Sequence, residues 1–422
     1  MQSAGNQSMQ SPGAKPGGIV VATIIGNAFV AYDFTVYSFS ALIIGRLFFP
    51  SDNPLSSFLL SLGTFGAGFF MRPLGAMFIG HLASTRGRKT AMTWSIALMT
   101  LGTWMIAFLP TAASIGVTAA WLMVLARLMQ GFAAGGEIGP ASAVLMESVP
   151  FNRRCYLTSW RGASQGAAAF AAALVGATLT ALLSSKAMHD WGWRIPFVLG
   201  GFIGPVGWYL RRRMPSVPVN APERPRFTTL FRQHAPTLGY GTLMMAAPSV
   251  GIYITVFYMP SYLVRTLHRP PAISLLIASL SGLVIMIVNP LVARIADRQA
   301  SRKPLQYLML VICLALTYPA FLALRAGVSN VAATAIILAY VTLALNNAGA
   351  STVLMMEAFA PPHRAAALSI MYSFGVTIFG GFSPLIVTWL IAVTGNPMMP
   401  AWYLIGAICI TLFALQRFPA AA

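Results

Sequence analysis

The sequence has 422 residues, of which 57% are hydrophobic and only 8% are charged. Soluble globular domains carry roughly 25% charged residues, so this composition excludes an ordinary water-soluble protein and indicates one that lies in lipid. The formal net charge of +19 does not indicate nucleic-acid binding, because the basic residues lie in short polar segments between long apolar runs.

Apolar runs long enough to cross a bilayer recur along the chain. A transmembrane helix needs about 20 predominantly apolar residues. Twelve runs meet this requirement, at residues 19–44, 57–82, 91–110, 117–146, 156–184, 194–212, 237–264, 271–293, 304–324, 329–356, 365–394 and 399–417. We therefore predict an all-α membrane protein with twelve transmembrane helices.

The longest polar interruption divides the chain into two halves. Residues 213–236 are predicted to be a cytoplasmic linker between a six-helix N-terminal half, 19–212, and a six-helix C-terminal half, 237–417. Residues 1–18 and 418–422 are predicted to be cytoplasmic tails. The first apolar run is too long for the apolar region of a signal peptide, so no cleavable signal is expected.

The distribution of basic residues predicts the orientation. If the N-terminus is cytoplasmic, 18 of the 27 lysines and arginines fall on the cytoplasmic face, six on the opposite face and three at membrane depth. This excess agrees with the positive-inside rule.

Two pairs of similar segments support the division into halves. Met146–Arg154 resembles Met356–Arg364, which lies 210 positions later, and Gly80–Lys89 corresponds to Ala293–Arg302, at an offset of 213. Both offsets are close to the length of one half. Duplicated halves place a substrate site near the bilayer midplane between them and indicate transport by rocking of one half against the other.

Two motifs resemble those of the major facilitator superfamily. Gly80–Lys89 is similar to the superfamily's loop between the second and third helices, and Arg127–Glu137 is similar to its fourth-helix motif. Ser84 departs from the first motif, where the superfamily usually has Asp. The resemblance covers nearly the whole chain and implies the major facilitator fold, with two pseudo-symmetric halves.

Further segments look like the metabolite:proton symporter family. They are Phe69–Gly75, Trp191–Phe197 and Phe379–Leu385. Within that family the likeness is to the citrate and tricarballylate symporters, through Gly26–Asn27, Tyr32–Phe34, Leu157–Trp160 and Ala163–Gln165. The resemblance implies a monomer in a bacterial cytoplasmic membrane that binds a small anion and protons, with no other cofactor and no nucleic acid.

Charged residues at membrane depth are the first functional candidates, because they are costly in lipid and usually mark a pathway. Asp33 is predicted to carry the proton, with Arg127 or Arg72 as its partner, since burial raises and a nearby arginine lowers a carboxylate's pKa. The alternative is a permanent ion pair that locks the helices together. Glu137 is either a second protonation site or a helix-packing residue.

Three arginines are predicted to contact substrate. Arg127 and Arg161 can hold carboxylates bidentately, although Arg127 could instead support its helix. Arg161 stands where the citrate-like relatives usually resemble Gln. Arg72, before Pro73, faces either the cavity or the cytoplasmic vestibule.

Uncharged polar residues complete the predicted substrate site. Those of the first half are Asn27, Tyr32, Gln130, Ser164 and Gln165, and those of the second are Tyr253, Tyr258, Asn289, Asn346, Asn347 and Tyr372. Each could equally bridge helices or lie at the interface, as polar and aromatic residues in membranes often do. Glycine clusters, such as Gly131 with Gly135 and Gly63 with Gly68, predict close helix approach.

A set of charged residues near the cytoplasmic ends of the helices is predicted to form the gate. Glu147 and Glu357 each precede an arginine by seven residues, near the two signature loops. Ion pairs there would keep the cytoplasmic side closed in the outward-facing state. The predicted gating residues are Arg86, Arg88, Glu147, Arg154, Asp297, Arg298, Glu357 and Arg364.

Other chemistries find little support in the sequence. Cys155, Cys313 and Cys409 have neither metal-ligand nor disulfide spacing, and the five histidines are widely separated, so no metal site is expected. No GxxxxGK[ST] loop is present, so an ion gradient rather than ATP should drive transport. An enzyme is not expected.

The sequence leaves several transport functions open. Import of citrate or a related di- or tricarboxylate with protons is the leading interpretation, and import of a zwitterionic osmolyte such as betaine or proline is the alternative. Efflux is disfavoured because the fifth span lacks GPxxGG, and a transporter-like sensor would need an output domain.

Overall fold

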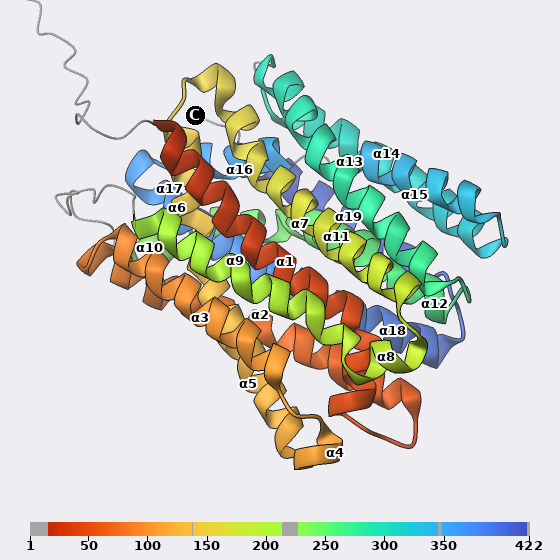
Figure 1. The fold of residues 1–422 in the computed structure, drawn as a ribbon. Helices are drawn as coiled ribbons and strands as arrows, with labels where there is room; N and C mark the ends of the chain where they lie inside the picture. Colours follow the sequence, from red (N-terminus) through yellow and green to blue (C-terminus); the bar gives the residue numbers. More distant parts are fainter. Residues whose placement is uncertain (1–15, 137, 213–226, 300, 345–347, 420–422) are drawn as a thin grey trace, which may run out of the picture.

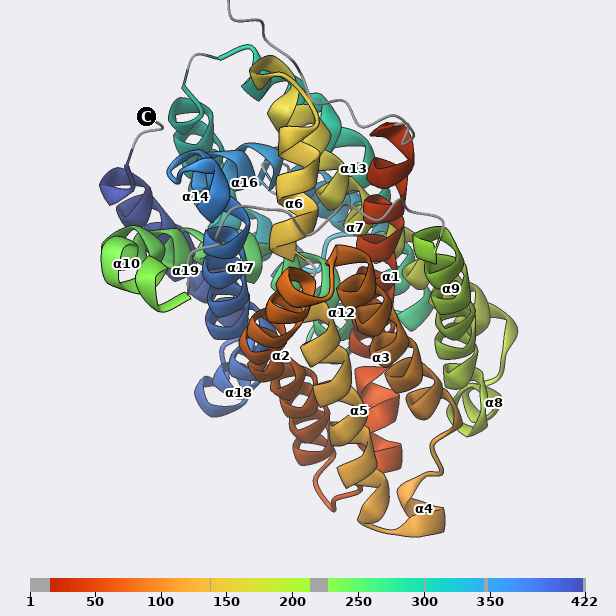
Figure 2. The ribbon, with the colours of Figure 1, turned by 90° about the vertical axis from the view of Figure 1, so that its left-hand side faces the viewer.

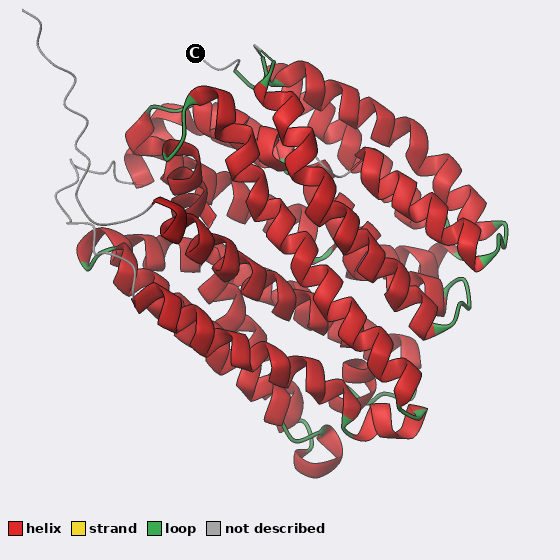
Figure 3. Ribbon diagram, turned by 45° about the horizontal axis from the view of Figure 1, so that its top comes forward, coloured by secondary structure: helices red, strands yellow, loops and turns green. Residues whose placement is uncertain are grey.

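The computed structural model describes residues 16–136, 138–212, 227–299, 301–344 and 348–419, and within these ranges the chain forms helices and no strand. Long helices lie side by side in a slanted bundle (Figure 1), and short loops gather at its two ends (Figure 3). Apolar side chains also face outward, including Trp121, which is 69% exposed, and Phe108, which is 68% exposed. A helix whose outer face is apolar, like its inner face, is suited to the hydrocarbon core of a bilayer.

The N-terminal half of the chain forms six crossings. They are α1 (Pro16–Phe48), α2 (Pro54–Thr85), α3 (Arg88–Phe108), α5 (Thr118–Gly135) followed by α6 (Ile138–Glu147), α7 (Arg154–Leu182) and α9 (Ile195–Arg212). The connections contain α4 (Ala112–Ile115), α8 (Ser185–Asp190) and the 3-10 turns η1 (Phe151–Arg153) and η2 (Gly192–Arg194). The fourth predicted span is therefore two helices, on either side of residue 137, which lies outside the described residues.

The C-terminal half also forms six crossings, two of which contain π-helix. The first is α10 (Phe227–Met244), α11 (Ala246–Ile252), the π-helix η3 (Tyr253–Tyr258) and α12 (Met259–Arg265). It is followed by α13 (Pro271–Asp297), α14 (Lys303–Arg325), and α15 (Asn330–Ala344) with α16 (Ala348–Glu357). After the turn η4 (Pro361–His363) come α17 (Arg364–Gly375), the π-helix η5 (Val376–Gly381) and α18 (Ser383–Thr394), then α19 (Met399–Arg417).

The predicted all-helical membrane fold is confirmed. Within the described part, nine helical segments are long and apolar enough to cross a membrane, and Asn330–Leu343 is a shorter apolar helix. Twelve crossings agree with this pattern once the divided helices are joined. The predicted linker 213–236 is shorter than expected, because α10 begins at Phe227 and residues 213–226 lie outside the described residues. The first residues of α10 are set apart by a kink at His234 (φ −127°, ψ 21°), two residues before Pro236.

The two ends of the bundle differ in their loops. We call the end with the α2–α3, α6–α7, α13–α14 and α16–α17 connections the basic end, and the end with α4 and α8 the opposite end. Figure 2 shows α4 and α8 at the bottom and the start of α1 and the end of α6 at the top. The end of α19 also lies at the basic end (Figure 1).

Glycines allow pairs of helices to touch through their backbones. A Cβ on Gly166 of α7 would lie 2.6 Å from the carbonyl oxygen of Gly282 on α13. In the first half, a Cβ on Gly131 of α5 would collide with the backbone of Gly68 on α2. The predicted close approach is therefore confirmed at Gly131 and Gly68, whereas a Cβ on Gly63 would meet nothing within 4 Å.

Candidate substrate and proton sites

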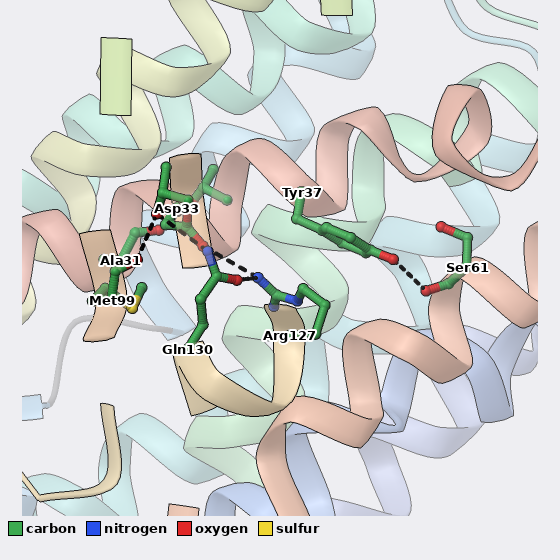
Figure 4. A network of polar contacts seen from close by, with 9 residues as sticks. Ala31, Asp33, Tyr37, Ser61, Met99, Arg127 and Gln130 are labelled. Atoms are coloured by element: carbon green, nitrogen blue, oxygen red, sulfur yellow. Dashed lines mark hydrogen bonds and ion pairs between the residues drawn. The ribbon is translucent and has the colours of Figure 1, made fainter. Parts of the chain in front are cut away.

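A buried ion pair joins α1 to α5. The Arg127 Nη1 atom lies 3.2 Å from Asp33 Oδ2, and both side chains are 0% exposed. Thr103 of α3 donates its hydroxyl to Asp33 Oδ1 at 2.6 Å, and Arg127 Nη1 also donates to Gln130 Oε1 at 2.6 Å. Gln130 closes the network by donating to Thr103 at 3.2 Å (Figure 4). Both carboxylate oxygens therefore accept a hydrogen bond.

Aromatic rings cover the rest of the Arg127 guanidinium. Its Cζ atom lies 4.3 Å from the ring centroid of Phe34, 4.4 Å from that of Tyr37 and 5.4 Å from that of Phe65. Cation–π attraction is strongest where water is excluded. The Nε and Nη2 atoms of Arg127 nevertheless have no hydrogen-bond partner among the described residues. Within the described residues, both carboxylate oxygens of Asp33 therefore have a hydrogen-bond partner, whereas two guanidinium nitrogens of Arg127 have none.

A central cavity lies beside this network, between the two halves. Its first part, which we call the N-lobe, has an empty volume of about 620 Å³, including space open to solvent. Polar residues lining it come from α1, α2, α7, η3 and α17, namely Asn27, Arg72, Arg161, Gln165, Tyr253 and Tyr372. All six were predicted to bind substrate. Their roles remain predictions.

The two arginines of the N-lobe are buried between aromatic rings. Arg72 is 4% exposed, and its Cζ lies 4.7 Å from the Phe34 centroid and 4.2 Å from the Phe69 centroid. Arg161 is 7% exposed, and its Cζ lies 4.9 Å from the Tyr372 centroid. Neither is paired with a carboxylate within the described ranges, and the Nε atom of each is without a partner there. Both can therefore accept an anionic ligand.

Asn27 fixes the backbone that carries Arg161. Its Nδ2 atom donates to the Arg161 carbonyl at 2.9 Å and to Ser164 Oγ at 2.8 Å. The α1 helix is thereby tied to α7 next to the cavity. Asn27 is consequently both a cavity-lining residue and a bridge between helices, two roles that the sequence left open.

Three predicted substrate residues lie elsewhere. Arg127 and Gln130 belong to the Asp33 network and are not among the residues lining the cavity. The Tyr32 hydroxyl donates to the Pro196 carbonyl at 3.1 Å, so Tyr32 ties α1 to α9. These three residues therefore do not line either part of the cavity. Glu137 and Asn346 lie outside the described residues, as does Asn347.

The cavity extends into the C-terminal half as a second part, the C-lobe. It shares Arg161, Gln165, Tyr253 and Tyr372 with the N-lobe. The empty volume of the C-lobe is about 1080 Å³, again including space open to solvent. Since four residues line both parts, the two lobes adjoin each other at these residues.

Contacts between the halves close the cavity toward the basic end. Asp297, the last residue of α13, accepts hydrogen bonds from the backbone N–H groups of Cys155 at 2.9 Å and Tyr156 at 2.8 Å. These N–H groups belong to the first turn of α7, where they have no partner within the helix. Arg154 pairs with Glu357 across the halves at 3.2 Å. The predicted residues Arg154, Asp297 and Glu357 thus meet at one contact.

Arg302 is a gate residue that the sequence did not single out. Its Nε atom lies 3.6 Å from Glu357 Oε2, and its Nη2 atom donates to the Phe151 carbonyl at 3.3 Å. It is 2% exposed. Arg302 is the last residue of the second-half signature loop, of which only Asp297 and Arg298 were predicted from the sequence to be gating residues.

Four other predicted gating residues are not among the described partners in this contact. Arg86, Glu147 and Arg298 are exposed, and Arg364 donates to the Phe359 carbonyl at 3.1 Å. The side chains of Arg88 and Ser84 are outside the described set. Asp297 and Glu357, rather than Glu147, therefore supply the carboxylates at this interface.

The halves also touch on the other side of the cavity. The Ser38 hydroxyl donates to the Phe257 carbonyl at 3.1 Å, and the Arg265 guanidinium lies 5.0 Å from the Phe58 ring centroid. The start of α2 and the end of α12 thus meet at the opposite end. The two halves therefore contact each other on both sides of the cavity.

Two helical halves around a cavity lined by buried arginines, with contacts between the halves toward both ends, are typical of a membrane transporter. A family model described as Major Facilitator Superfamily matches residues 17–375. The chain belongs to the Major Facilitator Superfamily. It is a transporter and not an enzyme.

Individual relatives agree with this assignment. A "Citrate-proton symporter" of Salmonella typhi is 33% identical over 398 residues, which are 93% of this chain and 92% of the relative. A "Proline/betaine transporter" of Salmonella typhimurium is 30% identical over 405 residues, 91% of this chain and 80% of the relative. A solved structure of the xylose transporter XylE from E. coli, in a partially occluded inward-open conformation, has a TM-score of 0.79 at 16% identity and covers 96% of this chain and 98% of its own. The last likeness supports the fold alone.

Proposed function

We propose that this protein imports citrate or a related di- or tricarboxylate together with protons across a bacterial cytoplasmic membrane. Both termini are cytoplasmic in this proposal, so that the basic end faces the cytoplasm, in line with the positive-inside rule. The family resemblance and the citrate-proton symporter at 33% identity support the choice of substrate.

The observation that carries the proposal is the pair of cavity arginines. Arg72 and Arg161 line the N-lobe, and neither is paired with a carboxylate in the part of the chain that the structure describes. A carboxylate that leaves water needs such partners to offset its desolvation. Guanidinium groups supply them in a bidentate geometry.

The Asp33 network supplies a route for coupling protons to this anion site. The Cζ atoms of Arg127 and Arg72 lie 4.3 and 4.7 Å from the same Phe34 ring centroid, so they are at most about 9 Å apart. Protonation of Asp33 removes the negative charge that balances Arg127. The uncompensated arginine then raises the positive potential at the N-lobe, which favours binding of the anion.

A zwitterionic osmolyte is the second candidate. Phe34, Tyr253, Phe257 and Tyr372 place aromatic rings around the N-lobe, and aromatic rings can bind a quaternary ammonium group. The proline/betaine transporter at 30% identity supports this candidate. The two cavity arginines favour the carboxylate.

Uptake into proteoliposomes distinguishes the two functions. We expect an inward proton gradient to drive accumulation of labelled citrate, with tricarballylate as a competitor. Betaine and proline should compete weakly. Gradient-driven betaine or proline uptake without citrate uptake would overturn the proposal in favour of the osmolyte.

A further inference from the structure

The C-lobe lies mostly inside the C-terminal half. Most of its walls come from α10, α11, α13, α14, α16, η5 and α19, which the proposed anion site does not use, and the rest come from α7, η3 and α17, which line both lobes. Apolar side chains make up much of the lining, namely Met244, Met245, Ile252, Ile285, Met309, Leu310, Met355 and Val376. Arg161, at the junction with the N-lobe, is the charged residue among the described residues that line it.

Three helices that line this lobe each carry a buried polar group with no hydrogen-bond partner among the described residues. These groups are Ser249 Oγ on α11, Asn289 Oδ1 on α13 and Gln306 Nε2 on α14. The three residues are 2%, 2% and 3% exposed. A buried polar atom without a hydrogen bond is destabilising, and such atoms in native structures usually find a partner in water or a ligand.

The chemistry of the lobe differs from that of the anion site. A hydroxyl group, an amide oxygen and an amide N–H among methionine and aliphatic side chains can bind an uncharged group that both donates and accepts hydrogen bonds. A second carboxylate would lack a cation there. Methionine side chains are flexible and adapt to ligands of different shape.

We infer that the C-lobe is a second subsite, which binds an uncharged, hydrogen-bonding extension of a carboxylate whose charged end lies on Arg161. The inference rests on the proposed carboxylate transport and deepens it. Substrates of this protein would then include carboxylates that bear an amide or hydroxyl substituent. The junction residues Gln165, Tyr253 and Tyr372 line both lobes, and in this proposal the bound molecule passes between the lobes beside them.

Competition in proteoliposomes tests the subsite. Succinate and N-acetylaspartate have the same two carboxylates and differ in an uncharged amide. We expect N-acetylaspartate to inhibit labelled citrate uptake with an inhibition constant roughly three- to tenfold lower than that of succinate, the range expected for one or two net hydrogen bonds.

Substitutions of residues that line the C-lobe test whether the lobe causes this preference for N-acetylaspartate over succinate. In Asn289→Leu and, separately, in Ser249→Ala, the ratio of the two inhibition constants should fall to about one. Ser281→Ala is the matched control on α13, because the Ser281 hydroxyl bonds the Ile277 carbonyl of its own helix at 2.8 Å and does not line the lobe. This control should keep the wild-type ratio.

Cys313 provides a readout that does not depend on transport. It lines the C-lobe, and Cys155→Ser with Cys409→Ser leaves it as the remaining cysteine. N-acetylaspartate should slow its alkylation by N-ethylmaleimide more than succinate does. Equal inhibition and equal protection by the two compounds would overturn the subsite while leaving carboxylate transport intact. No citrate uptake, and no protection by either compound, would overturn the proposed function and the subsite together.

Discussion

Asp33 is held by a hydroxyl and a guanidinium in a place that water does not reach. The Thr103 and Arg127 donors occupy both of its oxygens, so the ionised form is stabilised only while this geometry persists. Removing one partner of a buried ion pair costs about 3–5 kcal/mol. A change in the position of α1 relative to α5 can therefore decide whether Asp33 binds a proton.

Asp33→Asn tests the proton role. The amide keeps the size of the side chain and cannot titrate, so we expect gradient-driven accumulation of citrate to be lost while exchange of labelled for unlabelled citrate continues. Thr103→Val, which removes one hydrogen bond and leaves the carboxylate, should keep accumulation at a shifted pH. Full accumulation by Asp33→Asn would instead identify a structural ion pair.

Arg161 is predicted to bind a carboxylate from α7. Because hydrogen bonds to charged groups contribute about 1.5–3 kcal/mol, Arg161→Gln should raise the KM for citrate roughly 10- to 100-fold. Arg161→Lys should recover part of this loss. An unchanged KM in Arg161→Gln, measured in the same proteoliposomes, would remove Arg161 from the substrate site.

At the scale of elements, the start of α7 is the part of the gate with the most contacts. Asp297 caps the first turn of α7, where a carboxylate also interacts favourably with the helix dipole. Cys155 belongs to this turn, and its side chain is buried. Opening of the basic end must break these hydrogen bonds. The accessibility of Cys155 therefore reports on the gate.

Asp297→Asn should weaken the closed gate. We expect alkylation of Cys155 to become roughly tenfold faster, in a background of Cys313→Ser and Cys409→Ser, because the amide can accept only one of the two N–H groups and that hydrogen bond is no longer charge-assisted. Asp190→Asn, at the opposite end and 54% exposed, is the control. Equal alkylation rates in the two variants would show that Asp297 does not hold the gate.

Gly166 and Gly176 form a matched pair on α7. A Cβ at Gly166 would overlap the α13 backbone, whereas one at Gly176 would lie 3.4 Å from Leu275, an ordinary contact. Gly166→Ala should thus lower stability by about 1–3 kcal/mol. Gly176→Ala should be neutral or slightly stabilising. Thermal unfolding in detergent measures both, and equal midpoints would contradict the backbone contact.

At the scale of the whole molecule, the orientation in the membrane can be tested directly. We expect a fluorescent protein fused after Ala422 to fluoresce, because the C-terminus is predicted to be cytoplasmic. Alkaline phosphatase fused after Gly116, beyond α4, should be active because that loop is predicted to lie outside. The reverse pattern of activities would invert the proposed orientation.

The fold could be predicted from the sequence because hydropathy and the internal repeat are properties of long segments. The set of four charged residues at membrane depth was equally visible, since such residues are rare. The arrangement of these residues could not be predicted. Arg127 and Arg72 were equivalent candidates as partners of Asp33, and only the packing of the helices shows that Arg127 is the partner. Thr103 could not be singled out, because its hydroxyl could equally donate within its own helix, to the Met99 carbonyl that lies 3.0 Å away.

The polar C-lobe was also hidden from the sequence. Asn289 was recognised as a polar residue in an apolar span, but Ser249 and Gln306 are ordinary in composition. Their importance depends on which face of each helix meets the cavity, and the kinks and π-helical segments of this half change that face. A regular α-helical periodicity that is extended through a kink or a π-helix therefore assigns later residues to the wrong face of the helix.

The backbone contact between Gly166 and Gly282 has a mechanical consequence. The two backbones come so close here that little side-chain bulk lies between them, so tilting about this place should be easier than separation. We expect it to act as a pivot, so that a rotation that spreads the basic end brings the opposite end together. On this hypothesis the two ends cannot open at once, and the membrane would stay sealed to small ions during transport.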